Sequence, residues 1–395
     1  MRPLRLRDFR PLHALQALAM LALFAAAAFC AAQGVPASDP SAPNGASRSD
    51  TDRDLPTSLY GSPAQTMPLA AIPAVPPPDI ALVLPLATSD YARAADAVRA
   101  GFMDAAQAAG AAARVLVISH GDADVVAAFE KAHSSGARVV VGPLVRDHLR
   151  LLANANIDLP PTIALNQLDD GTSLPPLIYT LALAIESDAR VVARRAREDG
   201  ATNAAVIVSE APLMTRFAGA FNGEWLLAGG REPTTFQFAA TPDGLAVLRR
   251  ELAGDKFDVI IIAVEGSDAA LVKTFAPRVT TYASAQINQR ISLGTLRDLD
   301  DVRVVDLPWL VTPDSPAFAQ LPHKELANVA LDRLYALGID AFRVADAFRD
   351  GVPTEFEMDG ATGHLRLAEG RQISRQGTLG VFRQGRLVPL SAGAP

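Results

Sequence analysis

Small and polar residues follow most of the predicted strands of this chain, at positions where a ligand could be held. In open α/β sheets, ligands bind beyond the carboxyl ends of the strands, because the loops of neighbouring strands meet at that edge. This rule selects Thr88, Ser89, Ser119, Gly142, Pro143, Asn166, Gln167, Ser209, Glu210 and Glu265. We expect these residues to face one another across a cleft.

Gly142 and Pro143 lie between the predicted strand 138–141 and a predicted helix. A glycine at the start of a helix can present backbone N–H groups to an anion. The pair can also form a tight turn from strand to helix that binds nothing. Both interpretations remain open, and we favour the tight turn.

Enzymes and nucleic-acid-binding proteins are the classes that the sequence excludes. The six histidines are scattered, with no two at the spacing of a helical metal site, and neither a Gly-x-Ser-x-Gly nor a Gly-x-x-x-x-Gly-Lys motif occurs. The net charge is −7, which is unfavourable for binding nucleic acid. We therefore expect no catalytic residues, no metal and no cofactor.

Four residues are candidates for contact with a partner protein. They are Arg190, Arg194, Arg197 and Trp309. The arginines recur at helical spacing and form a basic stripe that an acidic patch could bind. The tryptophan lies in a predicted crossover and could be an interface anchor. The stripe could instead be a solvated helix face, since Glu198 and Asp199 partly balance its charge.

The elements that position these residues alternate between strand and helix from residue 79 onward. Continuous apolar runs such as Ile80–Leu84 predict strands that are covered on both faces. Further strands are predicted at 115–118, 138–141, 162–165, 205–208, 236–238, 258–262 and 302–305. The helix between the two halves is expected to start at Ser187 and to stop at Gly200. This order predicts an α/β fold of two lobes, each an open, mostly parallel sheet flanked by helices.

The last part of the chain predicts two helices, at about 322–337 and 339–349, separated at Gly338. A hairpin pattern follows and ends at Val388-Pro389. Because an isolated hairpin is marginally stable at best, it must join an existing sheet.

Residues 1–32 have the pattern of an export signal, with a basic start and an apolar stretch from residue 14. A membrane-spanning helix is the alternative, because about 20 apolar residues can span a bilayer. Cys30, the only cysteine, is a candidate for lipidation, although Phe29 replaces the small residue expected before it. Cleavage after Ala32 or Ala37 also fits. Residues 33–78 are rich in Pro, Ala and Ser and predict a disordered tether.

Four sequence blocks carry a family resemblance. They are Val141–Leu144, Ala164–Gln167, Leu334–Ala341 and Phe356–Gly363. In this order they resemble the LppC family, the penicillin-binding-protein activators of Gram-negative envelopes. The resemblance covers about residues 79–390 and implies a two-lobed fold like that of type I periplasmic binding proteins. We place lobe one at about 79–183 plus 302–350, and lobe two at about 184–301 plus 352–392.

The resemblance implies a non-enzymatic envelope protein that binds and activates a bifunctional penicillin-binding protein, and so regulates peptidoglycan synthesis. It also implies a periplasmic location, with attachment to the inner face of the outer membrane if Cys30 is lipidated. The helical-repeat domain that related activators often carry has no counterpart in residues 33–78. The alternative function is a periplasmic receptor that binds a small ligand between the lobes. Related amino-acid receptors place hydroxyl residues just after the turn at 142–143, to hold the carboxylate of the ligand. This chain has Leu144-Val145 there, which disfavours an amino acid as the ligand.

Overall fold

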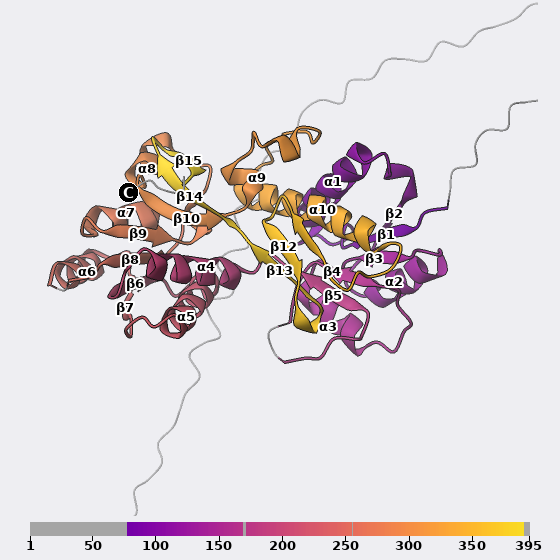
Figure 1. Ribbon diagram of the computed structural model, residues 1–395, viewed down its shortest axis with the longest axis horizontal. Helices are drawn as coiled ribbons and strands as arrows, with labels where there is room; N and C mark the ends of the chain where they lie inside the picture. Colours follow the sequence, from indigo (N-terminus) through magenta and orange to yellow (C-terminus); the bar gives the residue numbers. More distant parts are fainter. Residues whose placement is uncertain (1–76, 169–170, 255, 391–395) are drawn as a thin grey trace, which may run out of the picture. The chain divides into compact units, whose positions relative to one another are not determined.

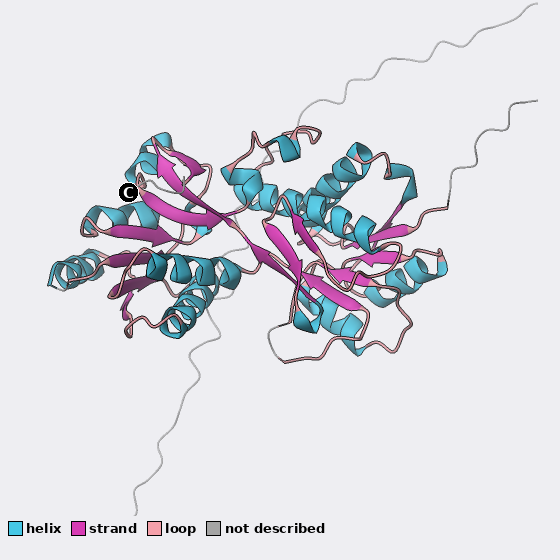
Figure 2. Ribbon diagram, viewed as in Figure 1, coloured by secondary structure: helices cyan, strands magenta, loops and turns pink. Residues whose placement is uncertain are grey.

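The computed structural model describes residues 77–168, 171–254 and 256–390, which form two β-sheets flanked by helices (Figure 1, Figure 2). The predictions for residues 1–32, for Cys30 and for the tether up to residue 76 lie outside the described residues. Within these three ranges, no helix is both long and apolar enough to cross a membrane.

The first sheet has eight strands in the order β11-β12-β13-β5-β4-β3-β1-β2. Its strands are β1 (Ile80–Leu84), β2 (Val115–Ser119), β3 (Val139–Val141), β4 (Thr162–Ala164), β5 (Ile178–Leu181), β11 (Glu357–Asp359), β12 (His364–Leu367) and β13 (Gln372–Gln376). From β13 to β2 all neighbours are parallel, whereas β11 and β12 add an antiparallel edge.

Helices cover both faces of this sheet, which explains why β1 is apolar at every position. Ile80 and Leu82 pack with α1 (Ala92–Ala108) and α10 (Val329–Phe348) on one face. Ala81 and Val83 pack with α2 (Val125–Ser134) and α3 (Arg146–Asn154) on the other face. We call this sheet and its four helices the first lobe.

The second sheet has seven strands in the order β15-β14-β10-β9-β8-β6-β7. Its strands are β6 (Ala204–Val208), β7 (Thr234–Gln237), β8 (Val259–Ala263), β9 (Thr280–Ala283), β10 (Val302–Asp306), β14 (Thr378–Arg383) and β15 (Arg386–Pro389). One face is covered by α4 (Ile185–Glu198) and α5 (Pro212–Leu227). The other face is covered by α6 (Pro242–Gly254), α7 (Gly266–Phe275) and α8 (Leu293–Asp298). We call this sheet and its five helices the second lobe.

The expected lobe boundaries are wrong for β10 and for β11 to β13, whereas β14 and β15 lie in the second lobe as expected. β10 lies in the second sheet, although we placed 302–350 in lobe one, and β11 to β13 lie in the first sheet, although we placed 352–392 in lobe two. The chain passes between the sheets after β5, between β10 and β11, and between β13 and β14. Strand membership depends on pairing with distant residues, such as Ile373 with Leu181, which the local pattern does not contain.

The two helices predicted around Gly338 are one continuous helix, α10, which begins after the N-cap Asn328. Glycine is required at 338 by close packing rather than by a helix end. A Cβ there would overlap with the carbonyl oxygen of Val98 in α1, and a Cβ at Gly101 would overlap with that of Tyr335 in α10. The two glycines therefore let the backbones of α1 and α10 touch.

The start of α4 also differs from the prediction. The helix begins at Ile185 with Ala184 as N-cap, so Ser187 lies in the first turn. Gly200 follows the C-cap Asp199 with a φ of 89°, as predicted for a helix stop.

Buried ion pairs lie where the chain passes between the sheets. Arg375 of β13 donates to Asp188 of α4 at 2.7 Å, and Arg333 of α10 donates to Asp306 at the end of β10 at 2.8 Å. Burial raises the pKa of Asp188, and the nearby charge of Arg375 opposes that rise. Removing one partner of such a pair costs about 3–5 kcal/mol, because the other charge stays buried. These ion pairs therefore help to hold together the segments that connect the two sheets.

Candidate functional site

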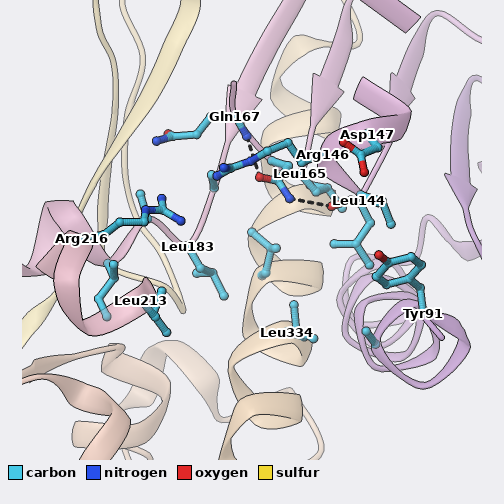
Figure 3. Close-up of a pocket in the computed structure, with 17 residues that line it drawn as sticks. Tyr91, Leu144, Arg146, Asp147, Leu165, Gln167, Leu183, Leu213, Arg216 and Leu334 are labelled. Carbon is cyan, nitrogen blue, oxygen red and sulfur yellow. Dashed lines mark hydrogen bonds between the residues drawn. The ribbon is translucent and has the colours of Figure 1, made fainter. Parts of the chain in front are cut away.

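A cavity of about 510 Å³ lies beside the carboxyl ends of β3, β4 and β5 (Figure 3). Its aliphatic wall consists of three alanines, Val145, Ile185 and six leucines, namely Leu144, Leu165, Leu183, Leu213, Leu334 and Leu337. Its polar residues are Tyr91, Arg146, Asp147, Asn166, Gln167 and Arg216. Apolar walls with a few polar groups, in a volume of roughly 300–1,000 Å³, are typical of small-molecule sites. This cavity is therefore the candidate ligand site.

The turn after β3 sets one wall of the cavity. Gly142 has a φ of 123°, and a Cβ there would overlap with the carbonyl oxygen of Val83. Its N–H donates to the carbonyl oxygen of Ile163 at 2.8 Å and is not available to an anion. Gly142 and Pro143 form a tight turn between β3 and α3, and the turn carries Leu144 into the wall.

Several polar side chains of the cavity have protein partners. Asn166 Nδ2 donates to the carbonyl oxygen of Leu144 at 3.0 Å, and Gln167 Oε1 accepts from Gln372 Nε2 at 3.2 Å. Arg216 Nε pairs with Glu186 at 2.5 Å. The residues that line the cavity can enclose an aliphatic group and offer it polar contacts at the rim. They do not pair a nucleophile with a base.

Of the ten residues predicted to face a cleft, the structure brings only Asn166 and Gln167 into the cavity wall. Thr88 instead caps the turn before α1, where its hydroxyl donates to the carbonyl oxygen of Pro85 at 2.9 Å. The remaining residues lie at strand ends, in turns or at helix caps. Four of them are exposed, namely Ser89, Ser119, Glu210 and Glu265, and Ser209 is half-buried. Leu213, Leu334 and Leu337 of the wall were missed, because an apolar residue in a helix gives no sign of which space it faces. Leu165 and Leu183 lie in loops after β4 and β5, where the search was for small and polar residues.

The predicted partner surface is only partly available. Arg194 donates to Glu224 at 2.9 Å, and Arg197 lies over the ring of Trp225, 5.3 Å from its centroid. Arg190 is exposed. Trp309 is 5% exposed and stacks on His323, with ring centroids 4.7 Å apart. Its predicted role as a surface anchor is therefore wrong, since α9 (Pro308–Val311) turns the ring into the core of the first lobe.

Two buried histidines, His120 and His148, touch just beyond the carboxyl end of β2, with ring centroids 5.2 Å apart. His120 Nδ1 lies 2.7 Å from the carbonyl oxygen of Gly121, and His148 Nε2 lies 3.1 Å from the carboxylate of Asp122. Burial lowers the pKa of His120, because the charged ring would lose its hydration, and the Gly121 carbonyl opposes this effect.

Stability should therefore depend on pH through His120. Below about pH 6.5 the unfolded chain protonates this histidine, whereas the native state does so only at lower pH. The free energy of unfolding should fall as pH falls through this window, by at most about 1.4 kcal/mol per pH unit. Urea unfolding at about pH 7.5, 6.5 and 5.5 measures the slope. A His120→Gln variant should show a smaller slope, and an unchanged slope would contradict this origin.

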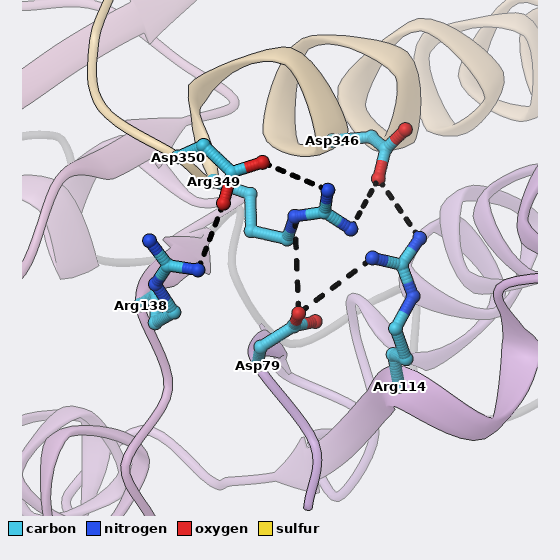
Figure 4. A network of polar contacts seen from close by, with 6 residues as sticks. All are labelled: Asp79, Arg114, Arg138, Asp346, Arg349 and Asp350. Carbon is cyan, nitrogen blue, oxygen red and sulfur yellow. Dashed lines mark hydrogen bonds and ion pairs between the residues drawn. The ribbon is translucent and has the colours of Figure 1, made fainter. Parts of the chain in front are cut away.

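A cluster of charged residues connects the end of α10 to the amino ends of β1, β2 and β3 (Figure 4). It comprises three aspartates and three arginines, namely Asp79, Arg114, Arg138, Asp346, Arg349 and Asp350. Arg349 pairs with all three aspartates, at 2.9 Å from Asp350, 3.4 Å from Asp346 and 3.8 Å from Asp79. The cluster is balanced in charge and has the character of a structural network.

Arg349→Ala should destabilise the protein by roughly 1–2 kcal/mol, above the ~0.2–1 kcal/mol of an isolated exposed pair. The reason is that one side chain serves three partners. The matched control is Arg99→Ala, which removes a single exposed pair with Asp96 at 2.6 Å. Urea unfolding measures the loss of stability in each variant. The difference between the two losses should be smaller at high salt, because salt screens the charges. Equal losses of stability in the two variants would mean that the network contributes no more than one exposed ion pair.

The two C-terminal sequence blocks contact each other through Asp340. Its buried carboxylate accepts hydrogen bonds from the N–H groups of Ala361 and Thr362, both at 2.7 Å, and from the Thr362 hydroxyl at 2.6 Å. A Cβ at Gly360 would overlap with this carboxylate. The first block supplies the acceptor and the second supplies a turn of donors, so both blocks have a structural role in this chain.

Comparison with known proteins identifies relatives of most of the chain. A family model described as "LppC putative lipoprotein" matches residues 56–247 and 243–385. The penicillin-binding protein activator LpoA of Klebsiella pneumoniae is 26% identical over 299 residues, which cover 66% of this chain and 42% of that protein. The chain thus spans less than half the length of this relative.

Two solved structures resemble the described residues. One, described as a putative branched-chain amino acid ABC transporter from Chromobacterium violaceum, has a TM-score of 0.69 and 31% identity, and covers 76% of this chain and 99% of its own. The other is the C-domain of LpoA from Haemophilus influenzae, described as a regulator of PBP1A, with a TM-score of 0.67 and 24% identity over 79% of this chain and 99% of its own. The predicted two-lobed α/β fold is confirmed.

Proposed function

The chain belongs to the LppC family, and we propose that it binds and activates a bifunctional penicillin-binding protein, and so regulates peptidoglycan synthesis. The family match over most of the chain carries the proposal, together with the name of the Klebsiella relative as an activator. This chain corresponds to 42% of that relative, so the proposal concerns the activity of the shared part.

In this proposal the protein contributes binding and no chemistry. A binding partner shifts a conformational equilibrium only by its difference in affinity for the two states. The activator must therefore bind the active conformation of the synthase more tightly than the inactive one. A tenfold activation needs a difference of about 1.4 kcal/mol, which a few interface contacts can supply.

We place the protein in the periplasm, held at the inner face of the outer membrane by a lipid on Cys30. The description of the family as lipoproteins supports this placement. The overall acidity of the chain fits a protein partner rather than nucleic acid.

A second candidate function is that of a receptor for a small ligand. The cavity of about 510 Å³ favours it, as does the similarity to the Chromobacterium protein, which is described as a putative amino acid transporter. Its aliphatic wall would suit a ligand with an apolar body.

Direct binding of the full chain to each bifunctional penicillin-binding protein of the source organism tests the proposal. We expect one synthase to bind with a dissociation constant on the order of 1 μM. If none binds while a small metabolite raises the melting temperature by several degrees, the receptor function replaces the activator function.

A further inference from the structure

We propose that the outer surface of α4 and α5 docks an acidic, amphipathic segment of the penicillin-binding protein; this inference rests on the proposed function. The surface, which we call the α4–α5 face, combines a row of arginines with an exposed apolar strip. It consists of Arg190, Arg194, Arg197, Gly219, Gly223, Leu226 and Leu227.

The two helices form one continuous surface because they lie parallel, and each contact joins a residue of α4 to one about 30 positions later, in or just past α5. Arg194 of α4 pairs with Glu224 of α5, and Arg197 donates to the carbonyl oxygen of Ala228, one residue past the end of α5. One end of α4 is fixed in the same way, where Glu186 pairs with Arg216. Figure 1 shows α4 and α5 next to each other on the second lobe. The arginine row therefore borders α5 along its length.

The strip on α5 is apolar. Leu227 is 85% exposed and its neighbour Leu226 is 43% exposed. No other two consecutive large apolar residues are exposed in the described part of the chain. Burial of a leucine side chain contributes about 1.5–3 kcal/mol, so this pair offers substantial binding energy.

Gly223 and Gly219 extend the strip by about one and two helical turns from Leu227. A Cβ on either glycine would meet nothing within 4 Å, so packing in this chain does not require them. Each glycine costs the helix about 0.5–1 kcal/mol relative to alanine. Their absence of side chains lets the backbone of a partner approach α5 closely.

The charge of the face indicates the chemistry of the partner. Arg194 is neutralised by Glu224, whereas neither Arg190 nor Arg197 has a carboxylate within ion-pair distance among the described residues. Arg190 is exposed, whereas Arg197 is half-buried and donates to the carbonyl oxygens of Ala201 and Ala228. Both cations border an apolar strip in a protein whose net charge is −7, and Arg190 is the more accessible of the two. Glu198 is the exposed acidic residue on the same helix. The complementary partner is a segment with an apolar side and a row of acidic residues.

Three substitutions test the face without disturbing the core. Leu227→Asp and Gly223→Glu place negative charge on the strip, and Arg190→Glu reverses a cation. Val247→Asp is the matched control, since Val247 is 40% exposed on α6, which covers the opposite face of the same sheet. Residues 227, 223 and 190 are exposed, so all variants should keep the wild-type melting temperature.

The measurement is the dissociation constant of the full chain for the synthase that the wild type binds, at low and high salt. Leu227→Asp and Gly223→Glu should weaken binding about tenfold or more, and Arg190→Glu about fivefold with a weaker salt dependence. Val247→Asp should stay within about twofold. If the three face variants bind as tightly as wild type, the α4–α5 face is overturned while the proposed function stands. If the wild type binds no synthase, both are overturned.

Discussion

Replacement of Gly338 by valine should destabilise the protein by about 3 kcal/mol or more, because overpacked positions without room to relax lie at the upper end of core substitutions. The new Cβ would overlap with the carbonyl oxygen of Val98 and crowd the amide nitrogen of Phe102, which are both backbone atoms of α1. A side chain could rotate away, but a helix backbone cannot. We expect a lower urea midpoint with an unchanged m value, which reports a loss of native stability.

Gly219→Val provides the matched control, since Gly219 also lies inside a helix and its added Cβ would meet nothing within 4 Å. Its stability should change by no more than about 0.5 kcal/mol, because valine and glycine differ little in helix propensity. Equal stability of the two variants would show that α1 and α10 do not pack through Gly338.

Asp340→Ala should cost about 3–5 kcal/mol, because it leaves three buried donors without an acceptor, each worth roughly 1–3 kcal/mol. The donors are the N–H groups of Ala361 and Thr362 and the Thr362 hydroxyl. The loss should also appear locally, as faster hydrogen exchange at the amides of 361 and 362. Urea unfolding and exchange measured by mass spectrometry test both effects.

Asp340→Asn is the intermediate control, since the amide keeps one acceptor oxygen and should lose less stability than alanine. Asp96→Ala removes an exposed carboxylate that has one partner, Arg99, and should cost at most about 1 kcal/mol. A loss as small as this for Asp340→Ala would mean that the two C-terminal blocks do not depend on each other.

The fold class could be predicted because buried parallel strands have a local signature. Ile80–Leu84 is apolar at every position, and the structure places alternate side chains in the two cores on either side of the sheet. The membership of later strands could not be predicted in this way. β13 pairs with β5 and β14 pairs with β10, yet only Gly377 separates β13 from β14.

Single residues were ambiguous where one residue type serves two purposes. Glycine is common at helix ends, but Gly338 lies inside α10, where it lets the helix contact α1. Trp309 follows a proline, as an exposed crossover residue could, but its ring packs against Phe318 and Tyr335. The leucines of the cavity, such as Leu213 and Leu334, come from helices far apart in the sequence. Each of these outcomes depends on the tertiary neighbour, which the local pattern does not record.

The most direct test of the central claim is the rate of peptidoglycan synthesis by the purified bifunctional penicillin-binding protein, with and without this protein. We expect the full chain to raise the rate severalfold, in proportion to the fraction of synthase bound, and Leu227→Asp to need a higher concentration for the same effect. A rate that does not change when the synthase is saturated with this protein would contradict the account.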